Sequence, residues 1–212
     1  MSNHCQVLHQ FFNGRKRFSF PFDESQLPLN GIYILFEKGE HAHDGDRITR
    51  IGAHTGTNQL RFRLFQHFVI ENKDRSIFRK NIGRAILNRN NDSFLEKWEL
   101  DLTSWEAKQN FSASIDFNKQ KDVELQVSRH IQENFSFVVF HVDDMVERLY
   151  IEKRLIATIS NCTECKPSEN WFGKFSTKGK IRISGLWQEQ HLWKKPFSEG
   201  EMSEIEALIK NH

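Results

Sequence analysis

The sequence lacks the features that would place the chain in a membrane or secreted class. No run of about eighteen apolar residues occurs in its 212 residues, so no membrane-spanning helix is predicted. The N-terminal stretch MSNHCQVLHQFFNGRKRF has no apolar core typical of a signal peptide. Cysteine is scarce and odd in number, with three residues, which favours reduced thiols over a disulfide framework. We therefore expect a cytoplasmic globular protein without a membrane partner.

Tyrosine is nearly absent as well, with two residues against nineteen Phe. One of them, Tyr33, stands in the apolar run GIYILFE (31–37), where Phe would fill a core at least as well. Its hydroxyl therefore indicates either a hydrogen bond inside the core or a functional role.

A strong excess of one charge is also missing, since the formal net charge is only +2. Locally the charges separate. Residues 60–89 hold eight Lys/Arg against two Asp/Glu, and residues 171–195 hold six against one, whereas residues 198–212 carry four Glu and one Lys. Basic stretches of this kind fit a polyanionic partner, and they fit solvated helix faces equally well.

Hydrophobic periodicity predicts alternating strands and helices. The expected strands are 31–37, 47–55 and 135–142, and the expected helices are 58–68, 73–89, 122–135, 144–162 and 198–210. Residues 38–46 are expected to form a loop with an Asp44-Gly45 turn, which makes the first two strands an antiparallel hairpin. Residues 1–30 show no clear period, 164–187 are expected to be rich in loops, and no internal repeat sets a domain boundary.

Polar residues recur on two of these elements. In the second strand Arg50, Gly52 and His54 share one face because side chains alternate with period two. On the following helix Arg63 and His67 are four residues apart and lie together. The basic residues of helix 73–89 are expected to face outward.

The order of these residues resembles the GIY-YIG nuclease family. The first motif is present as Gly31-Ile32-Tyr33, and the second stands as RIG (50–52), with Arg50 in place of the family Tyr. RLFQH (63–67) is similar to the family's Arg helix, IEKRLIATI (151–159) to its Glu helix and PSENW (167–171) to its Asn-bearing segment.

This resemblance implies an α+β fold with a small three-stranded antiparallel sheet flanked by helices, with helical and loop extensions. It implies an N-terminal extension over 1–30, a nuclease domain over 31–187 with an insertion near 90–134, and an acidic C-terminal helix over 188–212. It also implies Mg²⁺-dependent hydrolysis of phosphodiester bonds, with Mn²⁺ as the other candidate ion. The expected catalytic residues are Tyr33, Arg50, His54, Arg63, His67, Glu152 and Asn170.

The chemistry of these side chains agrees with that expectation. Glu152 offers a hard oxygen ligand to a divalent cation, and Arg63 can form a fork to phosphate oxygens. Tyr33 would orient or deprotonate water, with His67 relaying the proton. Arg50 would contact a phosphate near the scissile bond, or else pair with an acidic residue such as Glu37 across the hairpin.

The protein is expected to be a metal-dependent DNA endonuclease of restriction, defence or mobile-element type. A homodimer is a possible assembly. The residues expected to contact DNA are Lys73, Arg75, Arg79 and Lys80. A first alternative is a GIY-YIG-like module that binds nucleic acid without cutting it, since Arg50 replaces the family Tyr. A second is a hydrolase of small phosphoesters built on the cluster HAHDGD (41–46).

Two metal-like patterns carry little weight by themselves. CTEC (162–165) has zinc-like spacing, but a structural zinc needs four ligands and only Cys5 remains, so His would have to supply the rest. HAHDGD falls where a hairpin turn is expected, and Asp-Gly explains most of it. We therefore expect replacement of both Cys162 and Cys165 by Ser to change stability and activity little.

Overall fold

The computed structural model describes residues 2–210, and these form an α+β fold around one antiparallel sheet. The elements in chain order are α1 (Ser2–Asn13), β1 (Phe18–Ser19), β2 (Ile32–Ala42), β3 (Gly45–Gly52), α2 (Leu60–Phe68), α3 (Ile77–Arg89), α4 (Leu95–Trp98), α5 (Trp105–Phe111), α6 (Phe117–Asn134), β4 (Phe135–Phe140), α7 (Met145–Ser160), α8 (Gly179–Ser184) and α9 (Glu199–Lys210). Short 3-10 turns lie at Glu24–Gln26, Ser112–Ser114 and Phe172–Phe175. The expected fold class is confirmed.

The sheet has the strand order β1-β4-β2-β3 within the described residues, one strand more than expected. The additional strand is β1, which pairs through Phe18 and Ser19 with the β4 residues Phe137 and Ser136. A two-residue strand has no periodicity of its own, so the sequence pattern could not reveal it. β4 lies between β1 and β2, which explains its continuous apolar run.

The β2–β3 hairpin is longer than expected. Residues 38–42, expected in a loop, continue β2, and the turn is confined to His43 and Asp44. Both turn residues have positive φ angles, of 52° and 63°, as a two-residue hairpin turn before Gly requires. The register places Tyr33 directly opposite Gly52, so the last residue of the GIY motif faces the last residue of the RIG motif across the hairpin.

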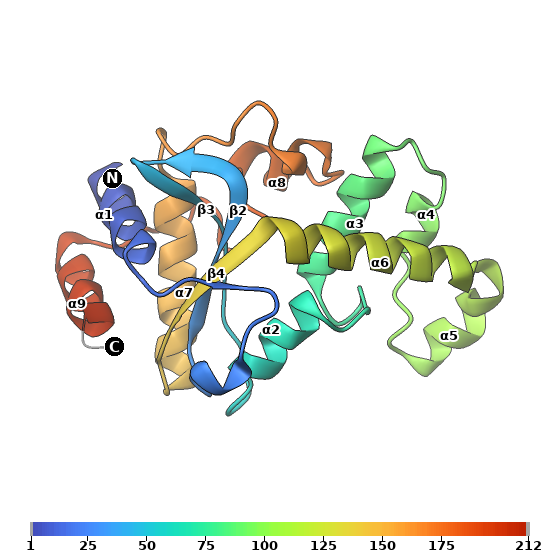
Figure 1. The fold of residues 1–212 in the computed structure, drawn as a ribbon, viewed down its shortest axis with the longest axis horizontal. Coiled ribbons are helices and arrows are strands. Elements are labelled where there is room, and N and C mark those ends of the chain that lie inside the picture. Colours follow the sequence, from blue (N-terminus) through green and yellow to red (C-terminus); the bar gives the residue numbers. More distant parts are fainter. Residues whose placement is uncertain (1, 211–212) are drawn as a thin grey trace.

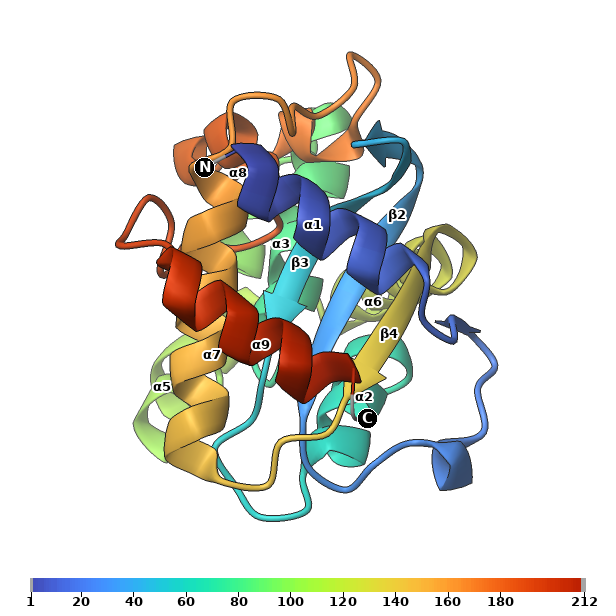
Figure 2. The same ribbon diagram turned by 90° about the vertical axis from the view of Figure 1, so that its left-hand side faces the viewer.

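Two apolar cores cover the two faces of the sheet. On one face α1, α7 and α9 pack against side chains such as Ile32 and Ile34. On the other, α2, α3 and α6 pack against Tyr33 and Leu35. Figure 1 shows α1, α7 and α9 to one side of the strands and α3 to α6 to the other, and α6 runs directly into β4. In Figure 2, α1 and α9 lie over the same face of the sheet.

The N-terminal helix α1 is absent from the sequence expectation. Its inward residues Cys5, Leu8 and Phe12 are fully buried, whereas Gln10 is exposed. This stripe is short, and docking on the sheet, more than local pattern, stabilises the helix. The proposed division into an extension, a nuclease domain and a C-terminal helix stays a prediction.

No helix of residues 2–210 is both long enough and apolar enough to span a bilayer.

Candidate active site

The Tyr33 hydroxyl lies within hydrogen-bonding distance of a buried histidine. Tyr33 Oη is 2.7 Å from His67 Nε2, and His67 Nδ1 is 2.7 Å from Ser76 Oγ. Gly52 permits this geometry, because a Cβ atom at that position would collide with the Tyr33 ring and hydroxyl. The use of Tyr in place of Phe at position 33 thus corresponds to a specific polar contact.

His67 is neutral in this arrangement. Its side chain is fully buried, and burial holds its pKa well below the ordinary value, with the charges of Arg63, Arg50 and Arg79 acting in the same direction. A neutral imidazole has one donor and one acceptor nitrogen, so it can join the Tyr33 and Ser76 hydroxyls in one chain. Ser76 caps the N-terminus of α3, because its Oγ accepts from the backbone N–H of Arg79, and the sequence analysis missed its second contact.

Arg50 is also buried, and only some of its guanidinium N–H groups have hydrogen-bond partners. One terminal nitrogen, Nη1, donates to the carbonyl of Trp187, and the guanidinium lies 5.2 Å from the centre of the Phe78 ring. Its Nε is buried without a hydrogen-bond partner. The alternative pairing with Glu37 is not made, since that carboxylate accepts instead from the indole N–H groups of Trp171 and Trp187 at 2.7 Å each.

Arg63, on α2, lines the same cavity as Arg50. Its Nη1 donates to Gln66 Oε1 at 3.0 Å and to the carbonyl of Arg75 at 2.9 Å. Across residues 2–210, no carboxylate lies within 4.0 Å of the guanidinium nitrogens of Arg50 or Arg63. Both arginines can therefore still bind an anion.

Glu152 reaches the cleft from α7. Its Oε1 accepts from the backbone N–H of Ala53, the residue that follows β3, at 3.0 Å. Burial raises the pKa of Glu152, whereas the Ala53 N–H and the charges of Arg50 and Arg63 oppose the rise. The carboxylate therefore stands in a positively charged setting without a direct ion pair.

These side chains meet at two adjoining cavities of about 440 and 580 Å³. Arg63 and Glu152 line both, and Tyr33 and Arg50 line the smaller one. The walls also include residues that the sequence analysis missed, namely Asn81, Gln188, Gln190 and His191. Asn81 has a buried Nδ2 without a partner, which is a second unused donor beside that of Arg50. Unsatisfied buried donors are costly, and both residues line the smaller cavity, which suits an anionic oxygen ligand.

Gln188 and Gln190 reach the cavity because the segment after α8 packs against β3. The backbone N–H of Trp187 donates to the Thr49 carbonyl at 2.8 Å, and the N–H of Ile51 donates to Gln188 Oε1 at 2.9 Å. The segment therefore lies along the free edge of β3 and closes one wall of the cleft. Residues in a loop leave no periodic signal, so this placement could not be predicted from sequence.

The donor set fits a hard divalent cation. Glu152 contributes a carboxylate at the cavity wall, and only one of its oxygens is used, by the Ala53 N–H. Carboxylate oxygen is the ligand type that Mg²⁺ and Mn²⁺ take in proteins, with water and phosphate completing the shell.

Two of the expected catalytic residues are not placed for direct chemistry. Asn170 is exposed and lines neither cavity, because the hydrogen bonds of neighbouring Ser168 and Trp171 to Glu40 and Glu37 hold its segment farther along the hairpin. His54 lines the larger cavity, but both of its ring nitrogens are used. Nδ1 lies 2.7 Å from the Gly56 carbonyl, and Nε2 accepts from the Gly31 N–H at 3.3 Å.

The expected outward orientation is wrong for four of the six basic residues of the helix predicted over 73–89, whereas Arg75 and Arg89 are exposed as expected. Arg79 is fully buried and its Nη2 lies 2.7 Å from Glu124 Oε2, while Lys73 and Lys80 are buried beside Asp74. Glu124 is distant along the chain, so the helix pattern could not show its pair with Arg79, whereas Asp74 directly follows Lys73 and lies six residues before Lys80. Lys73, Arg79 and Lys80 therefore offer DNA no accessible charge. Arg75, the fourth residue expected to contact DNA, is exposed.

The comparisons with known proteins agree with this geometry. A family model described as a GIY-YIG domain matches residues 3–212. Searches of curated proteins and of solved structures each found no match. The matched range includes the sheet, the Tyr33–Gly52 pair and the cleft lined by Arg63 and Glu152. The chain belongs to the GIY-YIG family, which supports a nuclease-type function.

Proposed function

We propose that the protein is a divalent-metal-dependent endonuclease that hydrolyses phosphodiester bonds of DNA. The observation that carries the proposal is the convergence of Tyr33, Arg50, Arg63 and Glu152 on one cleft, with His67 behind the tyrosine. Hydrolysis of a phosphodiester needs an oriented water, donors for the charge on the phosphate oxygens and help for the leaving oxygen. Tyr33 with His67 matches the first need and the two arginines match the second, while a metal held by Glu152 would meet the third.

Tyr33 is assigned to orienting the attacking water. When its O–H donates to His67 Nε2, its oxygen keeps lone pairs that can accept a proton from a water in the cavity that Tyr33 lines. Transfer would move the Tyr33 proton to His67 as the water proton reaches Tyr33. The nearby arginines and burial oppose a charged His67 in the free protein, and an anionic phosphate in the cleft would offset the arginine charges.

Arg50 and Arg63 are assigned to the non-bridging phosphate oxygens, since both are within the cavity wall and have no carboxylate partner. Glu152 is the residue that would hold the metal. When bound, Mg²⁺ or Mn²⁺ supplies electrostatic stabilisation of charge on the phosphate and the leaving oxygen. The restriction, defence or mobile-element setting remains part of the proposal.

Cleavage of a supercoiled plasmid tests the proposal. The protein is incubated with plasmid and Mg²⁺, Mn²⁺ or EDTA, and Glu152→Gln, purified in parallel, controls for contaminating nucleases. We expect nicked or linear DNA with a divalent ion only, and no cleavage by Glu152→Gln. The variant should bind DNA at least as tightly as the wild type, because removing a carboxylate reduces repulsion of phosphate.

Wild-type protein that binds DNA yet leaves it intact with either ion would contradict the proposal and favour a binding module. Cleavage by Glu152→Gln at a tenth of the wild-type rate or more would remove Glu152 from the metal-binding role.

A further inference from the structure

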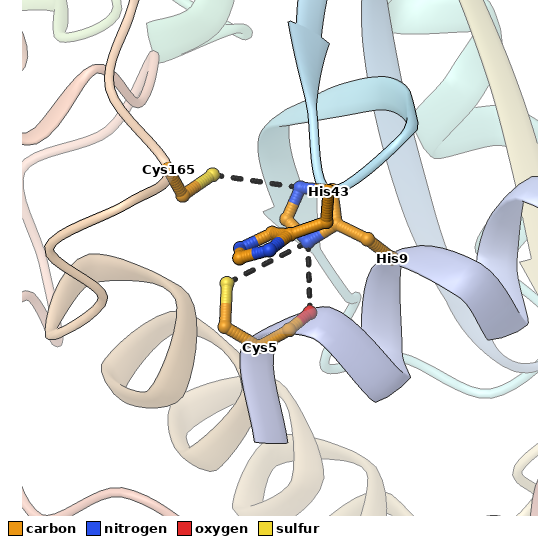
Figure 3. Close-up of side chains that lie close together, drawn as sticks. All are labelled: Cys5, His9, His43 and Cys165. Atoms are coloured by element: carbon orange, nitrogen blue, oxygen red, sulfur yellow. Dashed lines mark hydrogen bonds between the residues drawn. The ribbon is translucent and has the colours of Figure 1, made fainter. Parts of the chain in front are cut away.

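We propose that Cys5, His9, His43 and Cys165 form a structural zinc site, separate from the candidate active site. One ligand atom from each of these side chains lies within 4.8 Å of the other three. Figure 3 shows the four side chains converging from α1, from the hairpin turn and from the segment after α7. The sequence expectation discounted zinc because CTEC supplied too few ligands, and it expected loss of Cys165 to matter little; the proposal replaces that expectation for Cys165. The fold supplies the missing histidines from two other segments.

The chemistry of the set points to zinc. Two thiols and two imidazoles are the Cys₂His₂ combination of structural zinc sites, and sulfur ligands disfavour Mg²⁺. Ligand atoms around tetrahedral zinc lie roughly 3.3–3.8 Å apart, given the usual Zn–S and Zn–N lengths. The observed 3.5 Å between Cys165 Sγ and His9 Nε2 already matches a sulfur–nitrogen edge. No separation exceeds 4.8 Å, so the ligand atoms are at most about 1 Å beyond this range, which side-chain rotation can close.

His9 is oriented as a zinc ligand would be. Its Nδ1 lies 2.9 Å from the Cys5 carbonyl, to which a protonated Nδ1 donates. That tautomer leaves the Nε2 lone pair toward Cys165, and a carbonyl partner of this kind is the usual support of a metal-bound histidine. The Ile48 N–H also approaches Nε2, at 3.2 Å, and this is the hydrogen bond that a bound ion would weaken.

Three further observations favour a site over a chance cluster of polar groups. Cys5, His9 and Cys165 are buried, so the ion would be shielded from water. No disulfide joins the described cysteines, and all three are free thiols. The His43 ring stands 4.9 Å from the His9 ring, centre to centre, in the strained turn where its φ is positive. The position of His43 is thus set by the hairpin and directed to the cluster.

The site would join parts of the chain that are far apart in sequence. His9 and His43 are separated by 34 residues, and His43 and Cys165 by 122. A metal that closes long loops stabilises the folded state because its ligands are brought together only there. The cluster belongs to the core under α1 and α7, whereas Tyr33 belongs to the core of the other face. Its role would therefore be structural.

Metal content of the full-length protein without a histidine tag tests the site. We expect about one zinc ion per chain by elemental analysis, and for cobalt-loaded protein the visible absorption of tetrahedral Co²⁺ with thiolate ligands. Cys165→Ser should weaken zinc at least ~100-fold, because even residues that only support a ligand cost 10–100-fold. Cys162→Ser is the matched control. Cys162 is buried nearby with its Sγ 3.5 Å from His43 Nε2 but lies outside the proposed set, so this variant should keep the zinc.

A chelator strong enough to remove zinc should lower the melting temperature of the wild type and of Cys162→Ser, and should not change that of Cys165→Ser. If Cys165→Ser does not fold, the cobalt spectrum of the wild type decides. Wild-type protein that holds no zinc and shows no cobalt absorption would overturn the site. Retention of zinc by Cys165→Ser, or its loss from Cys162→Ser alone, would overturn the ligand set.

Discussion

Two pairs of arginines lie in the same small fold in opposite circumstances. Arg47 and Arg79 are fully buried inside the fold, and each pairs with a carboxylate. Arg47 lies 2.6 Å from Glu40, and Arg79 lies 2.7 Å from Glu124. Arg50 and Arg63 line the cleft and have no carboxylate partner within residues 2–210. Arg47 and Arg50 stand only three residues apart on one strand, so local sequence does not make the difference.

Under the proposed function, the contrast separates charges that maintain the fold from charges that would bind a phosphate. A buried guanidinium is tolerated when a carboxylate and further acceptors compensate for lost water. Arg79 has these, since it also donates to the His67 carbonyl and to Ser128 Oγ. Arg50, with an unpartnered Nε, lacks them. The missing acceptor is what a phosphate would provide.

The largest effect is expected from Arg79→Ala. The change leaves Glu124 buried without its cation and should reduce the free energy of unfolding by about 3–5 kcal/mol. Arg84→Ala on the same helix is the control, because its partner Glu99 is 39% exposed in its side chain, and it should cost markedly less. Chemical denaturation of the three proteins measures both. Equal losses in the two variants would show that burial of the pair does not matter.

Arg50→Ala should show the opposite behaviour. Loss of one donor to the reacting phosphate should reduce single-turnover cleavage by ~10²-fold or more, and the melting temperature should change little. Arg50→Lys should recover only part of the activity, because an ammonium cannot reproduce the fork of a guanidinium. Wild-type turnover in a destabilised Arg50→Ala protein would place Arg50 with the structural arginines and end its catalytic assignment.

The two kinds of arginine also show how far the sequence could predict the site. The alternation of β2 and β3 and the four-residue spacing of Arg63 and His67 are local patterns, and the family resemblance grouped these residues with Tyr33 and Arg50. The structure brings the four side chains together, and their catalytic roles stay a prediction. Partners from distant segments were not predictable. Glu124, which pairs with Arg79, comes from α6, and Gln188 comes from a loop beside β3.

The same reason explains the metal cluster. Cys5 and His9 belong to a helix whose formation depends on docking, and they meet Cys165 only in the finished fold. Spacing along the chain reveals a zinc site when its ligands come in close pairs, and here only one member of the CTEC pair is among the four.

Glu37 tests whether a buried carboxylate needs a cation at all. Two indole N–H groups hold it, and burial raises its pKa to about 7 despite the opposing effects of these donors and of Arg47. The folded protein therefore keeps the Glu37 proton at pH values where the unfolded chain has lost it. The stability that this group contributes is complete below about pH 4.3, the unfolded pKa, and is lost as pH rises through about 7.

Glu37→Gln removes that dependence while keeping an acceptor for the indoles. Relative to the wild type, the variant should gain about 1–3 kcal/mol in free energy of unfolding between pH 5 and pH 8. The neighbouring groups are Glu40, Arg47 and His130, whose pKa burial lowers to about 4, and they are present in both proteins. Parallel stability curves across this range would show that Glu37 titrates normally.

Arg75→Ala should give the smallest effect. It tests whether DNA contacts the exposed surface next to Arg63. Arg75 is the one exposed residue of the four expected to contact DNA, and its carbonyl accepts from Arg63. If its side chain contacts one phosphate, the slope of log binding constant against log salt should fall by about 0.9, with DNA affinity reduced only a few-fold at moderate salt.

Lys121→Ala on α6 removes the same charge from another exposed position and should leave the slope unchanged. The comparison needs catalytically inactive Glu152→Gln as background, so that binding is measured without cleavage. Equal slopes for Arg75→Ala and Lys121→Ala would mean that DNA does not contact Arg75 and approaches the cleft from another side.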